Sequence, residues 1–435
     1  MNCYPSYKPS GVKWLGEIPS HWEMKRWRFL MSENTTKNSN RKERLQLQFR
    51  YGDIVRKANQ SEESDVLDTI SKYTIVEPDD IMINGLNLNY DFISQRVAQV
   101  QERGVITSAY ISLRPTKIAN SRYFTYFLKS MDAKKMFHGM GTGIRLTLSY
   151  NELKNQFIPC PSPDEQSAIA AYLDTATAKI DAAIAQQQKM IDLLNERKQI
   201  IINRAVTKGL NPNAKMKDSG VEWIGEVPEH WEVRKTLFCL SMPITDGPHE
   251  TPQLYEEGIP FVSAEAVSCG NGKIDFDHIR GFISKEFYDE CCKKYIPKVH
   301  DIYMIKSGAT TGKVAIVDTD RVFTIWSPLA VFRCNDEVVF YEYMFYLLQS
   351  NPYQLQVQLG WSYGTQQNIG MRTLEKLKVP IPPLSEQKIF ASYIKDKCKP
   401  IDEAIEVANK QISLLQERKQ IIINEVVTGK VKICK

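Results

Sequence analysis

Leu193–Asn203 reads LLNERKQIIIN, and almost the same stretch returns as LLQERKQIIIN at Leu414–Asn424. A second repeated stretch lies upstream in each copy, GVKWLGEIPSHWE at Gly11–Glu23 and GVEWIGEVPEHWE at Gly220–Glu232. Two different repeats in the same order indicate that a whole structural unit is duplicated. The sequence therefore predicts a tandem duplication, and this prediction decides the fold.

Between the repeats, the two copies differ in residue identity but keep a similar order of apolar runs. Tyr110–Arg114 and Leu329–Arg333 have the pattern of strands, whereas Tyr123–Leu128 and Tyr343–Leu348 have the pattern of helices. Asp80–Ile83 aligns with Asp301–Met304 in the same way. Each variable block is predicted to be one α+β domain.

A proline-rich break follows each variable block, at 158–163 and 379–383, and a long helix is predicted after it. Apolar and small residues recur along the first helix at alternating spacings of four and three: Ile169, Leu173, Ala176, Ile180, Ala183, Gln187, Met190 and Leu194. The second helix repeats this pattern, which predicts a coiled coil in which Gln187 pairs with Gln411. Gly209 and Gly429 are expected to end the helices.

Three consecutive isoleucines near each helix end, 200–202 and 421–423, point around most of the helix circumference. One partner helix cannot cover all three, so we expect contact with a variable domain, another subunit or both. The predicted partner-binding residues come from this region and its basic flank: Arg197, Lys198, Ile201, Arg418, Lys419 and Ile422.

Length and composition predict an ordinary globular protein. A chain of 435 residues, 43% hydrophobic and 25% charged, is expected to form two or more domains. No apolar run approaches the roughly 20 residues that span a bilayer, and we expect a cytoplasmic protein. Nine scattered cysteines favour reduced thiols without a zinc site. The net charge of +5 permits a polyanionic partner without requiring one.

Sequence motifs for catalysis are incomplete. Ser307–Val314 resembles a phosphate-binding loop but has one residue too few between its glycines and valine in place of Ser/Thr. Gly139–Gly143 follows a helix-like run instead of a strand, and Asn351-Pro352-Tyr353 lacks the second proline of an amino-methyltransferase motif. The Glu-x-Lys pairs lie within helices. We therefore predict neither a catalytic site nor a bound cofactor or metal.

The polar residues of the variable blocks suit recognition of DNA. Asn, Gln and Arg can pair with base edges in the major groove, and Lys can hold phosphates. The predicted DNA-binding residues are Lys37, Arg41, Lys42, Asn84, Asn87, Asn89 and Arg96 in the first block, and His249, Lys306, Thr310, Thr311, Lys313, Gln366 and Gln367 in the second. The alternative for each of them is an ordinary surface polar group.

These stretches together resemble the DNA specificity subunit of type I restriction–modification enzymes. The resemblance rests on the Gly-Val-x-Trp-x-Gly-Glu-x-Pro-x-His-Trp repeats, on Glu-Gln after each proline break (165–166 and 386–387), and on the Leu-Leu-x-Glu-Arg-Lys-Gln-Ile-Ile-Ile helix ends. It covers nearly the whole chain.

The resemblance implies an α+β fold with two target-recognition domains, 1–160 and 210–380, and two long antiparallel coiled-coil helices, 161–209 and 381–435, related by a pseudo-twofold axis. It implies binding of double-stranded DNA at a bipartite site, with adenine methylation by two modification subunits and cleavage by restriction subunits. Because the variable blocks differ, we expect an asymmetric target, with a gap set by the helix length. The alternatives are a coiled-coil scaffold that never touches DNA and a self-sufficient modification enzyme.

Overall fold

The computed structural model describes residues 3–58, 64–144, 146–361 and 367–433. The chain divides into two compact units, unit 1 with Met1–Gln188 and Asn409–Lys435, and unit 2 with Lys189–Ala408. Each unit therefore contains one variable block and half of each long helix. Gln366, one of the predicted DNA-binding residues, lies outside the described residues.

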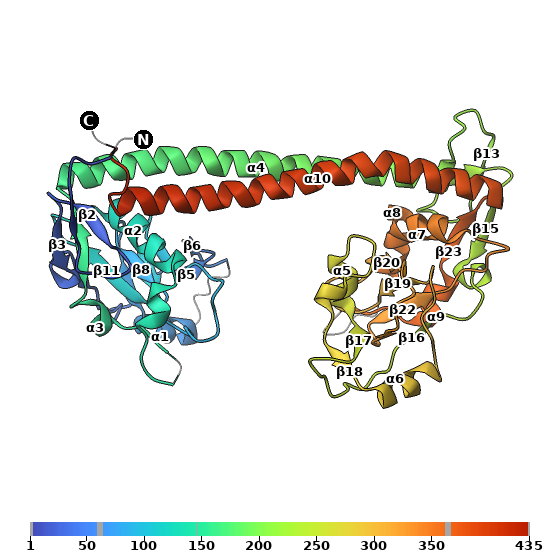
Figure 1. Cartoon of the computed structure of the whole chain (residues 1–435), viewed down its shortest axis with the longest axis horizontal. Coiled ribbons are helices and arrows are strands. Elements are labelled where there is room, and N and C mark those ends of the chain that lie inside the picture. Colours follow the sequence, from blue (N-terminus) through green and yellow to red (C-terminus); the bar gives the residue numbers. More distant parts are fainter. Residues whose placement is uncertain (1–2, 59–63, 145, 362–366, 434–435) are drawn as a thin grey trace. The chain divides into compact units, whose positions relative to one another are not determined.

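The two long helices are α4 (Pro163–Lys208) and α10 (Leu384–Val427). In unit 1 the first half of α4 lies beside the last half of α10, and in unit 2 the last half of α4 lies beside the first half of α10 (Figure 1). The helices are therefore antiparallel, as predicted. Each ends before a glycine with a left-handed backbone, Gly209 (φ 69°) and Gly429 (φ 73°).

Both units contain an antiparallel four-stranded sheet with the same strand order. In unit 1 the order is β4 (Met31–Glu33), β11 (Ile111–Pro115), β8 (Ile81–Ile83), β9 (Val97–Gln99). In unit 2 it is β16 (Thr245–Asp246), β22 (Leu329–Phe332), β19 (Ile302–Ile305), β20 (Val314–Ile316). The predicted strands and the duplication are thus confirmed.

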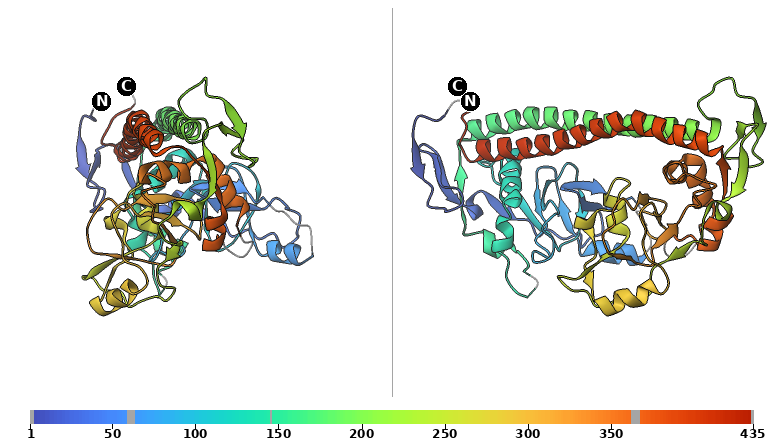
Figure 2. Two further views of the ribbon diagram at one scale, coloured as in Figure 1. Left: turned by 90° about the vertical axis from the view of Figure 1, so that its right-hand side faces the viewer. Right: turned by 45° about the vertical axis from the view of Figure 1, so that its right-hand side comes forward.

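The remaining strands of unit 1 form pairs: β1 (Tyr7–Pro9) with β2 (Glu17–Pro19), β3 (Glu23–Arg26) with β12 (Phe157–Cys160), β5 (Leu47–Arg50) with β6 (Asp53–Arg56), and β7 (Thr74–Val76) with β10 (Gly104–Ile106). Its short helices are α1 (Ser64–Ser71), α2 (Ser121–Ala133), α3 (Tyr150–Leu153), η1 (Trp27–Phe29) and η2 (Met136–Gly139). The two ends of the described chain lie close together in this unit (Figure 2), where the Tyr7 hydroxyl group is 3.5 Å from the Lys430 carbonyl oxygen.

Unit 2 repeats two of these pairs, as β13 (Met216–Asp218) with β14 (Glu226–Pro228) and β15 (Glu232–Lys235) with β23 (Lys378–Ile381). It differs by a three-stranded sheet, β18 (Phe282–Ile283), β17 (Ile259–Val262), β21 (Thr324–Ile325), in which β17 and β21 are parallel. Its short helices are α5 (Ala264–Cys269), α6 (Lys285–Cys292), α7 (Tyr341–Gln349), α8 (Asn351–Leu359), α9 (Met371–Lys376), η3 (Thr236–Cys239) and η4 (Phe276–His278).

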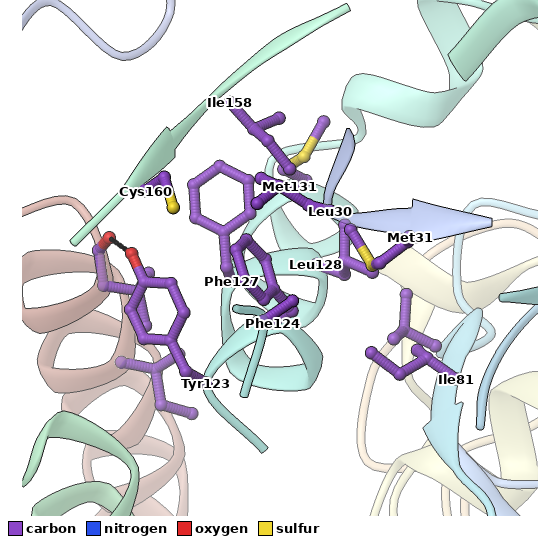
Figure 3. Close-up of a cluster of buried hydrophobic side chains, with 14 of the residues drawn as sticks. Leu30, Met31, Ile81, Tyr123, Phe124, Phe127, Leu128, Met131, Ile158 and Cys160 are labelled. Atoms are coloured by element: carbon purple, nitrogen blue, oxygen red, sulfur yellow. Dashed lines mark hydrogen bonds between the residues drawn. The ribbon is translucent and has the colours of Figure 1, made fainter. Parts of the chain in front are cut away.

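The core of each unit joins its sheet to the long helices. In unit 1, Phe124, Phe127 and Leu128 of α2 pack against β4 and β12 (Figure 3), and Ile422 and Ile423 of α10 belong to the same cluster. Ile202, Ala205 and Val206 of α4 play this part in unit 2. The isoleucine run is therefore partly covered by a variable domain, one of the two coverings predicted for it.

Gln166, in the first turn of α4, fastens that helix to the unit 1 domain. Its side-chain oxygen accepts a hydrogen bond from the Asn120 backbone N–H at 2.7 Å, and its amide group donates to the carbonyl oxygens of Ile118 (3.1 Å) and Pro161 (2.9 Å). The side chain is fully buried, so these bonds replace water completely.

Gln387 makes the same three bonds in unit 2, accepting from the Phe340 N–H at 2.7 Å and donating to the carbonyl oxygens of Val338 and Pro382. The glutamate before each glutamine binds the upstream repeat, because Glu165 lies 3.0 Å from His21 Nε2 and Glu386 lies 2.8 Å from His230 Nε2. The His-Trp and Glu-Gln repeats thus form one joint in each unit.

The other ends of the long helices are fastened in the same way. The Tyr123 hydroxyl group donates to the carbonyl oxygen of Val427 at 3.1 Å in unit 1. In unit 2 the Tyr343 hydroxyl is 3.0 Å from the Pro380 carbonyl oxygen and 3.4 Å from that of Val206, so it bridges β23 and α4. Burial raises the pKa of both phenols well above the ordinary value, so both stay neutral donors.

The predicted helix seam needs a correction near its middle. Met190 is 42% exposed, whereas its neighbour Ile191 is 6% exposed and takes the seam position. The predicted Gln187–Gln411 pair does not form, because the Gln187 side-chain oxygen has no partner and Gln411 is exposed. The buried stripe of α4 thus shifts by one residue, from position 190 to position 191, at the start of unit 2. The alternating spacing of four and three residues in the sequence did not show this shift.

Candidate nucleic-acid interface

Most of the predicted DNA-binding residues lie on or beside two topologically equivalent connections. Residues 84–96 join β8 to β9 in unit 1, and residues 306–313 join β19 to β20 in unit 2. In each sheet these two strands occupy the last two positions of the same strand order. The duplication therefore presents one loop position twice, with different residues on it.

The 306–313 connection of unit 2 is a tight polar loop between two strands, so the context of a phosphate-binding loop, strand then helix, is not met. Thr311 closes it with both its backbone N–H and its hydroxyl group on the Gly308 carbonyl oxygen. Gln367 lies beside the loop, because its carbonyl oxygen accepts from the Gly308 N–H at 3.0 Å. Thr310 is half-buried and Lys313 is exposed.

Lys306, at the start of this loop, does not offer a free charge to a ligand. Its side chain is only 12% exposed, and Nζ lies 3.2 Å from Asp246 Oδ2. Lys294 Nζ and His249 Nε2 lie 2.5 and 3.2 Å from the same carboxylate. The prediction that Lys306 binds DNA directly is therefore corrected: Lys306 positions the loop, and the exposed members of the cluster are His249 and Lys294.

Asp246 is the centre of this cationic cluster. Its burial alone would raise its pKa, but the hydrogen bonds from Lys294 and Lys306 outweigh burial, so the pKa lies below the ordinary aspartate value. One carboxylate thus faces two lysines, and the cluster keeps a net positive charge. The sequence gives no sign of Lys294 as a member of this cluster, because it is 48 residues from Asp246 in the chain.

In the 84–96 connection of unit 1, Arg96 is a structural residue. Its side chain is fully buried, and its guanidinium donates to the carbonyl oxygens of Asn84 (3.0 Å), Leu86 (2.8 Å) and Asp91 (2.6 Å). The prediction that Arg96 contacts DNA is therefore wrong. The same donors that could pair with guanine are used here to hold a loop.

The asparagines of this connection occupy different positions. The Asn84 side-chain oxygen accepts from the Leu86 N–H at 3.1 Å, which uses it inside the loop. Asn89 is half-buried with its side-chain oxygen enclosed, whereas Asn87 is exposed with a left-handed backbone (φ 53°). Asn87 keeps the geometry that direct contact requires.

The basic segment of unit 1 lies away from this loop in sequence and is exposed. Lys37 Nζ is 2.5 Å from the Ser108 hydroxyl oxygen, and Arg41 forms an ion pair with Asp68 at 2.5 Å. Lys42 is exposed. All three side chains remain at the surface, where phosphates could reach them.

The predicted partner-binding residues separate into two groups. Lys198 pairs with Asp402 at 2.6 Å in unit 2, and Lys419 pairs with Asp181 at 2.7 Å in unit 1, so both lysines bind the opposite helix. Ile422 is buried in the unit 1 core and Ile201 is half-buried against the unit 2 core. The prediction of direct partner contact is therefore corrected for Ile422.

Arg197 and Arg418 are exposed, and each shares its helix face with two exposed apolar side chains. We call Leu193, Arg197 and Ile200 helix patch 1 and their equivalents Leu414, Arg418 and Ile421 helix patch 2; the apolar residues of both are exposed. Spacings of four and three residues place each set on one face. Ile200 and Ile421 belong to the isoleucine runs for which an outside contact was predicted, whereas Leu193 and Leu414 were missed because the repeat pattern alone does not distinguish the seam from the outer face.

The described residues contain no group of three or more His, Cys, Asp or Glu side chains arranged for a metal ion. None of the described helices has the length and apolarity needed to cross a membrane. Fold and loops define a duplicated two-domain protein, in which like helix joints carry two α+β domains with unlike surface loops.

Comparison with known proteins agrees with this class. A sequence profile described as the type I restriction modification DNA specificity domain matches residues 49–191 and 250–414, which is more than half of the chain. The chain belongs to this family of type I restriction–modification specificity subunits. Such subunits are not themselves catalytic, because the enzymatic activities of type I systems reside on other subunits.

Two similar relatives are from Methanocaldococcus jannaschii. The type I restriction enzyme MjaVIII specificity subunit is 26% identical over 83% of this chain and 81% of the relative. The putative MjaX specificity subunit is 28% identical over 74% of this chain and 71% of the relative. A chain from a structure of a type I R-M system has the same fold, with a TM-score of 0.64 at 14% identity over 95% of this chain and 99% of that chain.

Proposed function

We propose that this chain recognises a bipartite, asymmetric sequence in double-stranded DNA and directs adenine methylation, and restriction, by partner subunits. One observation carries the proposal: equivalent joints hold two domains whose equivalent loops differ. Because the joints are alike, each domain is attached to the long helices in the same way and would present the same loop position to DNA. Because the loops differ, each domain would read its own half-site. The polar and cationic loop 306–313 with its neighbours His249 and Lys294 suits phosphates and base edges.

The test is to express the chain with its modification subunits and to map N6-methyladenine by sequencing the host genome. The expected result is a motif of two different half-sites separated by unread base pairs. Replacing the sequence of residues 306–313 by a different loop sequence should alter the bases of one methylated half-site and leave those of the other unchanged. A single uninterrupted motif, or a palindromic one, would contradict the proposal.

A DNA-binding assay separates this proposal from a scaffold. Affinity of the assembled complex for its target should fall steeply as salt rises, because lysines and arginines that neutralise phosphates release counterions. Lys294→Ala should weaken binding to all sequences about equally and make the salt dependence shallower. Binding that is independent of sequence and salt would support the scaffold alternative.

Helix patches 1 and 2 are proposed to bind two copies of the same modification subunit. The patches have the same residue types at the same helix positions, and apolar side chains on an exposed helix face beside an arginine are typical of protein interfaces. Two equal surfaces suit two equal partners.

This part is tested by counting bound subunits by mass. Leu193→Asp with Ile200→Asp should remove one modification subunit, and Leu414→Asp with Ile421→Asp should remove one as well. Ile389→Asp is the matched control, because Ile389 is an equally exposed isoleucine of α10 outside both patches. Full occupancy in both double variants would refute the assignment.

A further inference from the structure

The 84–96 connection of unit 1 is held rigidly from the inside. Beyond the carbonyl bonds of the Arg96 guanidinium, the Arg96 backbone N–H donates to Asp132 Oδ2 at 2.7 Å. Leu88 is fully buried in the unit 1 core, and the Asp91 side chain caps the N–H groups of Ile93 (3.1 Å) and Ser94 (2.9 Å). A 13-residue loop with this many internal bonds is preorganised.

Three large apolar side chains stand exposed on the outer face of this rigid loop. Tyr90 is 80% exposed, Phe92 is 53% exposed, and Ile93 is 94% exposed. Phe92 is fixed by stacking on His138 at a ring separation of 4.7 Å. We call these three residues the apolar tip. A fixed, exposed cluster of large apolar side chains is expected where a ligand binds.

The equivalent loop of unit 2 has the opposite chemistry. Its members include Lys306, Thr310, Thr311 and Lys313, and it lies beside the cationic cluster around Asp246. In the unit 1 loop, by contrast, the Asn84 oxygen, the Asp91 carboxylate and the Arg96 guanidinium bond within the loop. Residues 84–96, which the structure describes throughout, include no exposed lysine or arginine. Both loops follow the same strand of the same sheet.

We propose that the two domains read DNA with the same loop position but by different chemistry, and that the apolar tip packs against thymine C5-methyl groups in the major groove. The inference rests on the proposed function, because equivalence to the polar loop of unit 2 is what directs the tip to DNA. Thymine methyls are the apolar groups that a groove exposes without unstacking. Inserting a side chain between base steps would instead cost a few kcal/mol of unstacking.

The proposed adenine methylation would supply the expected ligand. An adenine methylated within the half-site that unit 1 reads faces a thymine on the opposite strand, and that thymine carries a C5-methyl group. Ile93 has the largest exposed fraction of the three and is the first candidate for the contact. Its side chain is uncharged, so the contact adds affinity without changing the number of phosphates neutralised.

The test uses the complex assembled with its modification subunits and duplexes carrying the target found by methylation sequencing. Each thymine is replaced in turn by deoxyuridine, which lacks only the C5-methyl group. For the wild-type complex, one or more positions within a single half-site should weaken binding about fourfold each, the value of one buried methyl. Ile93→Ser should weaken target binding by at least that factor, with the same salt dependence.

The decisive arm combines the two changes. Ile93→Ser should be insensitive to deoxyuridine at the positions that matter to the wild type, while Ile93→Val should keep part of the sensitivity. Ile118→Ser is the matched control, because Ile118 is also an exposed isoleucine of unit 1. In β11, Ile111 pairs with Ile83 beside the 84–96 loop, and Pro115 pairs with Met31 at the other end of the sheet. Ile118 follows Pro115 and therefore lies at the end away from the loop. The Ile118→Ser complex should bind like the wild type.

The outcomes separate the inference from the function on which it rests. If the wild-type complex does not distinguish its target from a scrambled duplex, the proposed function fails. If it does, but Ile93→Ser binds like the wild type, the apolar tip does not contact DNA. If Ile93→Ser binds weakly while deoxyuridine has no effect on the wild type, methyl readout is overturned in favour of insertion. Loss of a modification subunit in Ile93→Ser would reassign the tip to protein docking.

Discussion

Replacing Gln166 by leucine tests the joint between the unit 1 domain and α4. The substitution nearly preserves volume but removes three hydrogen bonds, at 2.7, 3.1 and 2.9 Å, in a fully buried place. At about 1 kcal/mol for each bond the joint loses about 3 kcal/mol, because the backbone groups of 118–120 and Pro161 cannot turn to water instead. A local loss of that size corresponds to about a hundredfold faster opening.

Hydrogen exchange followed by mass spectrometry measures this opening directly. The Asn120 N–H donates to Gln166 itself, so exchange in peptides covering 118–123 should accelerate about a hundredfold in Gln166→Leu. Peptides covering 338–343 in unit 2 should be unchanged. Gln387→Leu is the internal control and should produce the reverse pattern.

An increase of less than about fivefold at 118–123 in Gln166→Leu would refute the reasoning, because it would mean that the three bonds are replaceable by water. Equal acceleration in both regions would refute the independence of the two joints. Either result would leave the Glu-Gln repeat without the structural role assigned to it.

Three further predictions concern the helices and the cationic cluster. Lys198→Ala and Lys419→Ala should each lower the free energy of unfolding by about 1 kcal/mol, measured by urea unfolding, since both ion pairs are partly solvated. The pKa of Asp246 is lowered in the folded state, so the carboxylate stabilises the fold at neutral pH, and this contribution is lost as pH falls below about 4. In thermal unfolding, Asp246→Asn should therefore lose less stability than the wild type when the pH is lowered through about 4. Inserting seven residues into both long helices, after Lys189 and after Lys410, should lengthen the gap of the methylated motif by about three base pairs, because a helix rises about 1.5 Å per residue and DNA about 3.4 Å per base pair. The gap is measured by methylation sequencing. An unchanged gap would count against the prediction that helix length sets the gap.

The architecture was predictable because its determinants are repeated. The repeats, the central strands and the proline breaks give the same pattern twice, so the duplication, the α+β domains and the long paired helices follow from the residues, whereas the antiparallel direction of the helices came from the family resemblance. The joints also left a signal, since Glu165-Gln166 and Glu386-Gln387 recur in register. Most of what they bind was not visible, because His21, Ile118 and Asn120 lie more than 40 residues away in the chain.

The roles of single polar residues were not predictable to the same degree. Arg96 and Lys306 have the chemistry of DNA-binding residues, yet one holds three carbonyl groups and the other a buried carboxylate. Residue type limits what a side chain can bond, but only tertiary packing decides whether its donors face solvent. The apolar tip was missed for the converse reason, because a pattern search expects large apolar side chains to be buried.

The distribution of constant and variable residues gives the repeat a physical meaning. Asn424 accepts from the Ser130 hydroxyl group at 3.0 Å, and its equivalent Asn203 accepts from the Asn351 N–H at 2.9 Å, so the last residue of the repeated stretch bonds its own domain in both units. The joint atoms themselves lie outside loops 84–96 and 306–313. Each loop meets the joint-bearing helix by a hydrogen bond, from the Arg96 N–H to Asp132 Oδ2 in unit 1 and from Gln354 Nε2 to the Gly312 carbonyl oxygen in unit 2. A substitution in loop 84–96 or 306–313 can therefore change what the domain contacts at little cost to its attachment, which is the condition under which recognition can diverge while the partner-binding helices stay alike.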